Sequence, residues 1–135
     1  RRQRQMCIRD SNKRPYHTII PGFLTEVGKP KMSFGVMGGY MQHQGHLQMV
    51  SRVVDYNQNP QAASDAPRWH VQADYKVLLE QGFSQEVADQ LVQRGHELEF
   101  DERESTFGGA QLILRTADGF VGGSDHRKEG LVAGF

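Results

Sequence analysis

Two adjacent glycines, Gly38 and Gly39, stand between a predicted strand over residues 31–37 and a predicted helix over residues 40–56. The first N–H groups of a helix have no partner within it and point outward, at the positive end of the helix dipole. Glycine leaves such groups open to close approach because it has no Cβ. The pair therefore predicts either a binding site for negative charge or a tight strand-to-helix turn without a ligand.

A second pair of polar side chains, His17 and Thr18, opens a predicted strand over residues 18–24. A histidine ring and a threonine hydroxyl can both donate hydrogen bonds. The two residues therefore either contribute donors to a binding site or pair with backbone groups at a strand edge.

Other side chains are of types that could bind a metal or catalyse a reaction, but their spacing in the sequence does not suit either role. His43 and His46 are three residues apart in a predicted helix, but no third ligand or H-E-x-x-H pattern accompanies them, which favours a solvated helix face over a metal site. Ser124, Asp125 and His126 are direct neighbours, so they cannot converge as a catalytic triad must.

The helix over residues 40–56 must position the glycine pair. Its apolar residues recur at helical spacing and predict the buried face, namely Leu47, Met49, Val50, Val53 and Val54. Asn59 and Pro60 are a good N-cap and a good first residue for a short helix that ends at Asp65.

The second half of the chain mixes strands with another helix. Ser84 predicts a helix start, Gly95 predicts its end, and Val87, Leu91 and Val92 are expected to face inward. Further strands are predicted over residues 69–72, 76–80, 96–100, 109–115 and 120–123, the last two joined in a hairpin. Mixed elements with antiparallel pairing predict an α+β layered domain.

Residues 1–11 read RRQRQMCIRDS and contain four of the sixteen basic residues and the only cysteine. Clustered arginines of this kind are typical of basic arms that bind nucleic acid or membranes. The ten residues before Ser11 also resemble, without mismatch, one reading frame of the adapter DNA used in transposase-based sequencing libraries. We therefore expect residues 1–11 to be a non-native, disordered leader and the domain to begin at residue 12.

Without residues 1–11 the chain keeps 12 basic and 15 acidic residues, a formal net charge of −3. No basic surface then favours a nucleic-acid partner. The remainder has no cysteine, which excludes disulfides, thiolate nucleophiles and cysteine-bound zinc. No apolar run approaches the roughly 20 residues of a transmembrane helix, so no membrane partner is expected.

Four segments resemble the gamma-glutamyltransferase family, in the family's order and spacing across residues 12–135. They read KRPYHTIIPGF (13–23), FGVMGGYMQHQGHLQ (34–48), DAPRWHVQ (65–72) and GGSDHRKEGLVAGF (122–135). The resemblance implies an N-terminal-nucleophile hydrolase, in which a precursor cleaves itself and the new N-terminal threonine of the small subunit attacks a γ-glutamyl amide. It also implies a four-layer αββα sandwich, of which this chain is the later part of the small subunit.

The resemblance assigns roles to the two pairs. Gly38 and Gly39 match the glycine pair that forms the family's oxyanion hole. His17 and Thr18 match the place where better-known members carry a Ser-Ser pair that binds the substrate's α-carboxylate, a departure that puts strict γ-glutamyl specificity in doubt. Asp125 and Arg127 match a polar motif near the family's C-terminus, and we interpret them, like Arg68 and Trp69, as structural.

The resemblance implies no metal and no organic cofactor. The nucleophilic threonine would lie upstream of Lys13, so this chain alone is expected to be inactive. Its expected partners are a small γ-glutamyl substrate, the large subunit and the N-terminal part of the small subunit. Two alternatives remain open: an amidohydrolase of the same family acting on another small acid amide, and a non-catalytic interaction domain.

Overall fold

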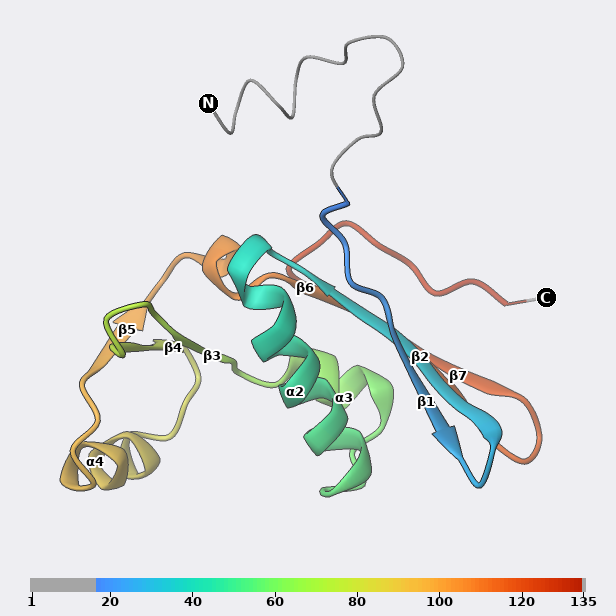
Figure 1. Ribbon diagram of the computed structural model, residues 1–135, viewed down its shortest axis with the longest axis horizontal. Helices are drawn as coiled ribbons and strands as arrows, with labels where there is room; N and C mark the ends of the chain where they lie inside the picture. The colour runs from blue at the N-terminus through green and yellow to red at the C-terminus, as the bar shows by residue number, and fades with distance from the viewer. Residues whose placement is uncertain (1–16, 135) are drawn as a thin grey trace, which may run out of the picture.

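The computed structural model describes residues 17–134, so the proposed leader at residues 1–11 lies outside the described residues. The described chain mixes helices and strands, which confirms the α+β prediction (Figure 1). In chain order the elements are β1 (Gly22–Glu26), β2 (Lys29–Met37), the 3-10 helix η1 (Gly39–Met41), α2 (Gln42–Val54), α3 (Pro60–Asp65), β3 (Trp69–Val71), β4 (Val77–Glu80), α4 (Gln85–Gln93), β5 (Leu98–Asp101), the 3-10 helix η2 (Glu104–Phe107), β6 (Gly109–Arg115) and β7 (Phe120–Ser124).

Four antiparallel strands form sheet A, in the order β1-β2-β6-β7. Glu26 pairs with Lys29 across a two-residue turn in which Val27 and Gly28 have φ values of 49° and 75°. Two positive φ values are the geometry of a type I′ turn, whose twist suits a β-hairpin. β6 and β7 form the hairpin that the sequence predicts.

The first strand begins later than predicted. Residues 17–21 lie outside any strand and are exposed, whereas pairing with β2 starts at Gly22. Pro21 has no N–H to contribute to a ladder. The β-branched residues Thr18, Ile19 and Ile20 favour a strand, which is why one was predicted from residue 18. They have no paired strand beside them, because the pairing with β2 begins only after Pro21.

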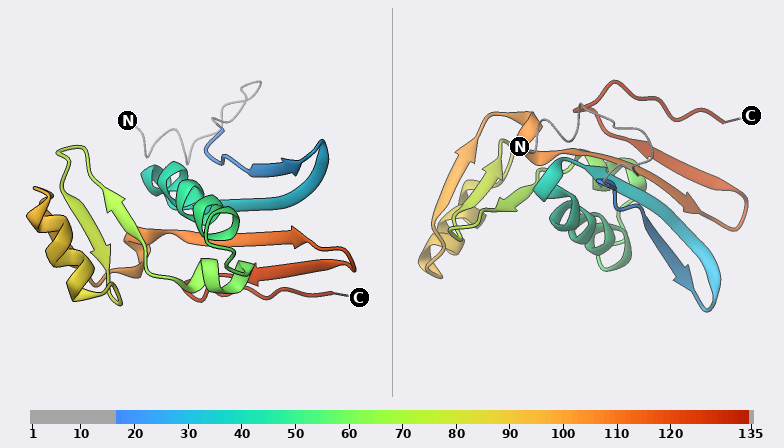
Figure 2. Two further views of the ribbon diagram at one scale, coloured as in Figure 1. Left: turned by 90° about the horizontal axis from the view of Figure 1, so that it is seen from below. Right: turned by 45° about the horizontal axis from the view of Figure 1, so that its top comes forward.

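The helices α2 and α3 pack against one face of sheet A (Figures 1 and 2). The core between them contains Met32, Phe34, Val36, Met49, Val53, Ala63, Ala110 and Leu112. A Cβ added at Gly45 would lie 2.6 Å from Val36 Cγ1, so this glycine lets α2 rest directly on β2. The contact fixes the start of α2 beside the end of β2, where the glycine pair connects them.

The buried face of α2 differs in part from the predicted one. Met49 and Val53 are buried as expected, but Leu47 and Val54 are 57% and 53% exposed. Leu47 lies about 200° around the helix from Met49, so both cannot face the sheet. Gln48 is buried instead, because it faces a second sheet.

Sheet B has the order β3-β4-β5, with β3 and β4 antiparallel and β4 and β5 parallel. It lies beside α2, away from the long hairpins of sheet A (Figure 1). α4 connects the parallel strands and ends at Gly95 as predicted, in a Schellman motif closed by a bond from the His96 N–H to the Leu91 carbonyl (3.1 Å). Its buried residue is Ala88, whereas Val87 and Val92 are exposed, contrary to prediction.

Two glutamines attach sheet B to α2. The Gln48 amide donates to the Trp69 carbonyl (2.9 Å) and accepts from the Trp69 N–H (3.1 Å). Gln44 makes the same pair of bonds with Val71, at 2.9 and 2.7 Å. Gln44 and Gln48 are four residues apart on the helix, and Trp69 and Val71 are two residues apart on β3; both spacings correspond to about 6 Å. Each glutamine can therefore bond to one backbone position at the free edge of β3.

The short helix α3 confirms its predicted start, because the Asn59 side chain accepts from the Ala62 N–H (2.8 Å) and Pro60 follows as first residue. Within residues 17–134, none of the helices is long and apolar enough to cross a bilayer.

Candidate functional site

The glycine pair lies at an exposed corner between β2 and α2. Gly38 is the residue before η1, and its carbonyl accepts from the Met41 N–H (3.0 Å). Among residues 17–134, the N–H groups of Gly38 and Gly39 have no hydrogen-bond partner. The structure therefore leaves two adjacent donors free at the start of a helix, where the helix dipole favours negative charge.

The two glycines are required for different reasons. Gly38 has φ 138°, and a Cβ there would lie 2.8 Å from the Gly108 Cα, so two backbone segments meet at this point. Gly39 has φ 59°, but a Cβ there would meet nothing within 4 Å. Space beside Gly39 is therefore open within the described chain, and its positive φ is a conformational reason for glycine that the sequence does not reveal.

The structure brings His17 and Thr18 to the same corner. The Gln42 Nε2 donates to the Thr18 carbonyl (2.8 Å) and to the Gly39 carbonyl (3.3 Å). The two candidate pairs, 21 residues apart in the sequence, are thus joined through Gln42, the first residue of α2. Their roles in catalysis and binding remain predictions.

The two histidines of α2 differ from each other. His43 is exposed, as expected for a solvated face. His46 is half-buried, contacts the Phe34 ring edge-on at 5.0 Å, and accepts from the Val36 N–H (3.1 Å). Burial and, secondarily, His43 lower the pKa of His46, so it is neutral and helps hold α2 on β2. The described residues contain no group of three or more side chains arranged to hold a metal ion.

A buried ionic cluster connects the two sheets. It consists of Arg68, Glu80, Asp125 and Arg127, all nearly inaccessible to solvent. Arg68 pairs with Asp125 and also donates to the carbonyls of Ser64 (3.0 Å) and Phe107 (2.8 Å). Arg127 forms a two-bond pair with Glu80, at 2.5 and 2.6 Å, and a bond to Asp125 at 3.2 Å.

The cluster fixes Asp125 as a carboxylate. Burial alone would raise the pKa of Asp125, but N–H groups of Ala110 and Arg127 and the Arg68 guanidinium outweigh it and lower the pKa. Since partners come from β4 of sheet B, β6 of sheet A, α3 and η2, the cluster supports the structural interpretation of Arg68, Asp125 and Arg127. Sequence reasoning missed Glu80, because a glutamate that ends an apolar strand gives no signal of its distant partner.

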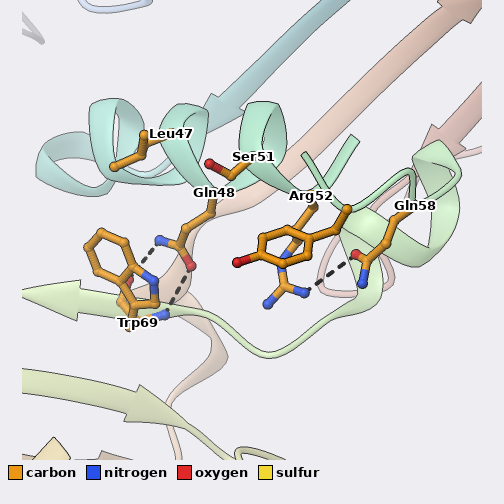
Figure 3. A pocket seen from close by; sticks show the side chains of 7 residues that line it. Leu47, Gln48, Ser51, Arg52, Gln58 and Trp69 are labelled. Carbon is orange, nitrogen blue, oxygen red and sulfur yellow. Dashed lines mark hydrogen bonds between the residues drawn. The ribbon is translucent and has the colours of Figure 1, made fainter. Parts of the chain in front are cut away.

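Trp69 starts β3 and borders a hollow of about 520 Å³ between α2 and the β3 edge (Figure 3). Its backbone is held by Gln48, while Arg52 donates to Gln58 (3.4 Å) and to the Pro67 carbonyl (2.9 Å). None of the four predicted site residues lines this hollow, so it is separate from the exposed glycine corner.

Comparison with known proteins shows the family to which the chain is related. A family model described as gamma-glutamyltranspeptidase matches residues 3–135. The match begins inside the proposed leader, whose boundary at residue 12 stays a prediction. The mixed fold and the similarity to solved structures of cephalosporin acylase from Bacillus halodurans and of gamma-glutamyltranspeptidase from Helicobacter pylori also show that the chain is part of an N-terminal-nucleophile hydrolase fold.

Three relatives illustrate the match. The glutathione hydrolase-like YwrD proenzyme of Bacillus subtilis is 32% identical, over 93% of this chain and 25% of its own length. The glutathione hydrolase proenzyme of Escherichia coli is 33% identical, over 92% of this chain and 21% of its own length. The crystal structure of cephalosporin acylase from Bacillus halodurans is 44% identical with a TM-score of 0.83, over 92% of this chain and 25% of that chain. The chain thus spans a quarter or less of these proteins.

Proposed function

Because this chain belongs to the gamma-glutamyltranspeptidase family, we propose that it forms part of an enzyme that cleaves or transfers γ-glutamyl amides. The reaction proceeds through an acyl intermediate on an N-terminal threonine supplied from outside residues 12–135. The observation that carries this proposal is the pair of free N–H groups at Gly38 and Gly39.

The glycine pair acts as the oxyanion hole. Attack on an amide carbonyl places negative charge on its oxygen, and a backbone donor fixed at that position is worth about 3–4 kcal/mol in the transition state. Here the donors are held in place before substrate binds, because Gly38 packs on Gly108 and α2 packs on β2. The open space beside Gly39 is where the carbonyl approaches.

The acid group of the substrate binds near His17 and Thr18. Both residues are exposed beside the glycine corner, and the Thr18 hydroxyl and the histidine ring supply donors. A carboxylate accepts such hydrogen bonds readily. The pair therefore orients the end of the acyl group, while the glycine N–H groups bind its reacting carbonyl.

A second candidate is an amidohydrolase that acts on another small acid amide. The departure from a Ser-Ser pair at residues 17 and 18 favours it, as does the 44% identity to a protein named cephalosporin acylase. The same oxyanion chemistry serves both reactions, so the two candidates differ only in the acyl group that they accept.

The remaining three-quarters of a family member are the proposed partner. The face of sheet A opposite α2 exposes Phe23, Met37 and Ile113, although alternate residues of the same strands form the core. In a four-layer sandwich a second sheet packs against such a face. We therefore assign this face to contact with the parts of the enzyme outside this chain.

A chimera tests the proposal. Residues 12–135 replace the matching quarter of the Bacillus halodurans cephalosporin acylase, which supplies the nucleophile, and turnover is measured with γ-glutamyl-p-nitroanilide and glutaryl-p-nitroanilide. Preference for the γ-glutamyl amide supports the first candidate, and preference for the glutaryl amide supports the second. A folded chimera that hydrolyses neither compound contradicts an acyl-transfer role.

A further inference from the structure

Within residues 17–134, one side-chain hydrogen bond joins the segment that carries His17 and Thr18 to the rest of the site. Residues 17–21 belong to no strand and are exposed, so ladder hydrogen bonds do not hold them. Gln42, at the start of α2, donates from Nε2 to the Thr18 carbonyl at 2.8 Å. This bond spans 24 residues of sequence and connects the segment to the helix.

The same amide nitrogen also contacts the glycine pair. The Gln42 Nε2 lies 3.3 Å from the Gly39 carbonyl, which in addition accepts the backbone N–H of Gln42. A primary amide nitrogen carries two hydrogens, one for each carbonyl. Since both neighbours are acceptors, only the NH₂ end of the Gln42 amide fits here.

We propose that Gln42 is a positioning residue that sets the separation between the acid-binding residues 17 and 18 and the oxyanion donors at Gly38 and Gly39. This inference rests on the proposed function. The separation must match the distance from a substrate's terminal acid to its reacting carbonyl, so Gln42 determines which length of acyl group is accepted. In this role Gln42 acts through the Thr18 and Gly39 carbonyls and not on the reacting atoms.

The glycine donors themselves do not depend on this side chain. The Gly38 carbonyl accepts from the Met41 N–H (3.0 Å), and the Gly39 carbonyl keeps the bond from the Gln42 backbone. Removal of the Gln42 amide therefore frees the segment around Thr18 and leaves the oxyanion donors in place.

The kinetic test uses Gln42→Met, which keeps the length of the side chain and removes the donor. In the chimera described above, KM for the preferred acid-bearing anilide should rise roughly 3- to 10-fold, the equivalent of one net hydrogen bond. For butyryl-p-nitroanilide, which has no terminal acid, KM and kcat should change less than about twofold. Gln42→Glu, which places an acceptor against two carbonyls, should raise KM at least as much.

Gln44→Met is the matched control, because Gln44 lies on the same helix but bonds to Val71 in sheet B. It should leave the ratio of the two KM values unchanged. An equal KM change for both anilides in Gln42→Met, or the same ratio change in Gln44→Met, would overturn the positioning role.

A measurement without turnover separates this inference from the proposed function. In the 135-residue chain, ¹⁵N heteronuclear NOEs of Ile19 and Ile20 should fall in Gln42→Met and stay unchanged in Gln44→Met. Unchanged NOEs in Gln42→Met would show that the Gln42 amide does not hold the segment around Thr18, and would overturn the positioning role even if the chimera is active. If the chimera is inactive but the NOEs fall in Gln42→Met, the proposed function and the selectivity that depends on it are contradicted. The hydrogen bond from Gln42 to Thr18 is then still supported as the contact that orders the segment.

Discussion

At the start of α2, the N–H groups of Gly38 and Gly39 have no hydrogen-bond partner among residues 17–134, whereas around Arg68 most buried donors have an acceptor. The first region is exposed, and within the described chain its segment around Thr18 is joined to α2 by the Gln42 amide. The second is buried and is tied to both sheets by four charged side chains.

The difference separates residues that hold the fold from residues able to act on a ligand. The four charged side chains of the cluster are paired with one another, and within residues 17–134 the Arg68 Nε is the one guanidinium nitrogen of the cluster without a partner, so the cluster has little capacity left for a substrate. Free donors on a packed backbone have that capacity and need no rearrangement to use it. Residue type alone would have ranked the charged cluster as the more reactive region.

The largest effect is expected from breaking the buried cluster. Asp125→Ala leaves Arg68 without its carboxylate and the Ala110 N–H without its acceptor, and loss of one partner of a buried pair costs about 3–5 kcal/mol. Urea unfolding of the 135-residue chain measures this loss. Glu26→Ala is the control, because its exposed pair with Lys31 should be worth at most about 1 kcal/mol. Equal losses of unfolding free energy in Asp125→Ala and Glu26→Ala would contradict the structural role assigned to the buried cluster.

A smaller effect is expected where α2 binds sheet B. Gln48→Ala removes two bonds to the Trp69 backbone and should lower the free energy of unfolding by about 1–3 kcal/mol. The matched variant Gln85→Ala removes an exposed bond to Asp89 on α4 and should cost no more than about 0.5 kcal/mol. A Gln48→Ala variant as stable as the parent would show that the β3 edge is held by other contacts.

The smallest effect is expected from pH. Burial lowers the pKa values of His46 and His70, so the unfolded state binds these protons more tightly than the folded state does. Stability should therefore be full above the unfolded pKa of about 6.5 and decrease as the pH falls through it. His46→Gln should flatten this decrease between about pH 7 and pH 5, as followed by thermal unfolding. An unchanged slope would mean that His46 does not hold α2 on β2 as a neutral acceptor.

Much of the fold could be predicted from local patterns. The cap at Asn59, the stop at Gly95 and the hairpin between β6 and β7 depend on residues close together in sequence, and the structure confirms them. The exposure of Leu47 and the burial of Gln48 could not be predicted, because sheet B determines them from a distant part of the chain.

The candidate site was predictable in its residues but not in its connections. The glycine pair and the residues at 17 and 18 follow from a strand-to-helix junction and a family resemblance, and their roles stay proposals. The hydrogen bond from Gln42 to Thr18 and the pairing of Arg127 with Glu80 join residues far apart in the sequence. Patterns of local residue spacing therefore cannot predict these contacts. The positive φ of Gly39 depends likewise on the path of the backbone.

The most direct test of the central claim compares Gly39→Ala with Gly28→Ala in the chimera. Both glycines have positive φ (59° and 75°) and open space at the Cβ position, so each variant should lose a similar stability of about 1–2 kcal/mol. Only Gly39 adjoins the proposed oxyanion. If the Gly38 and Gly39 N–H groups bind it, the added methyl displaces the substrate, and kcat should fall roughly 10²-fold in Gly39→Ala alone. Equal kcat values in the two folded variants would contradict the account and leave the glycine pair as a turn.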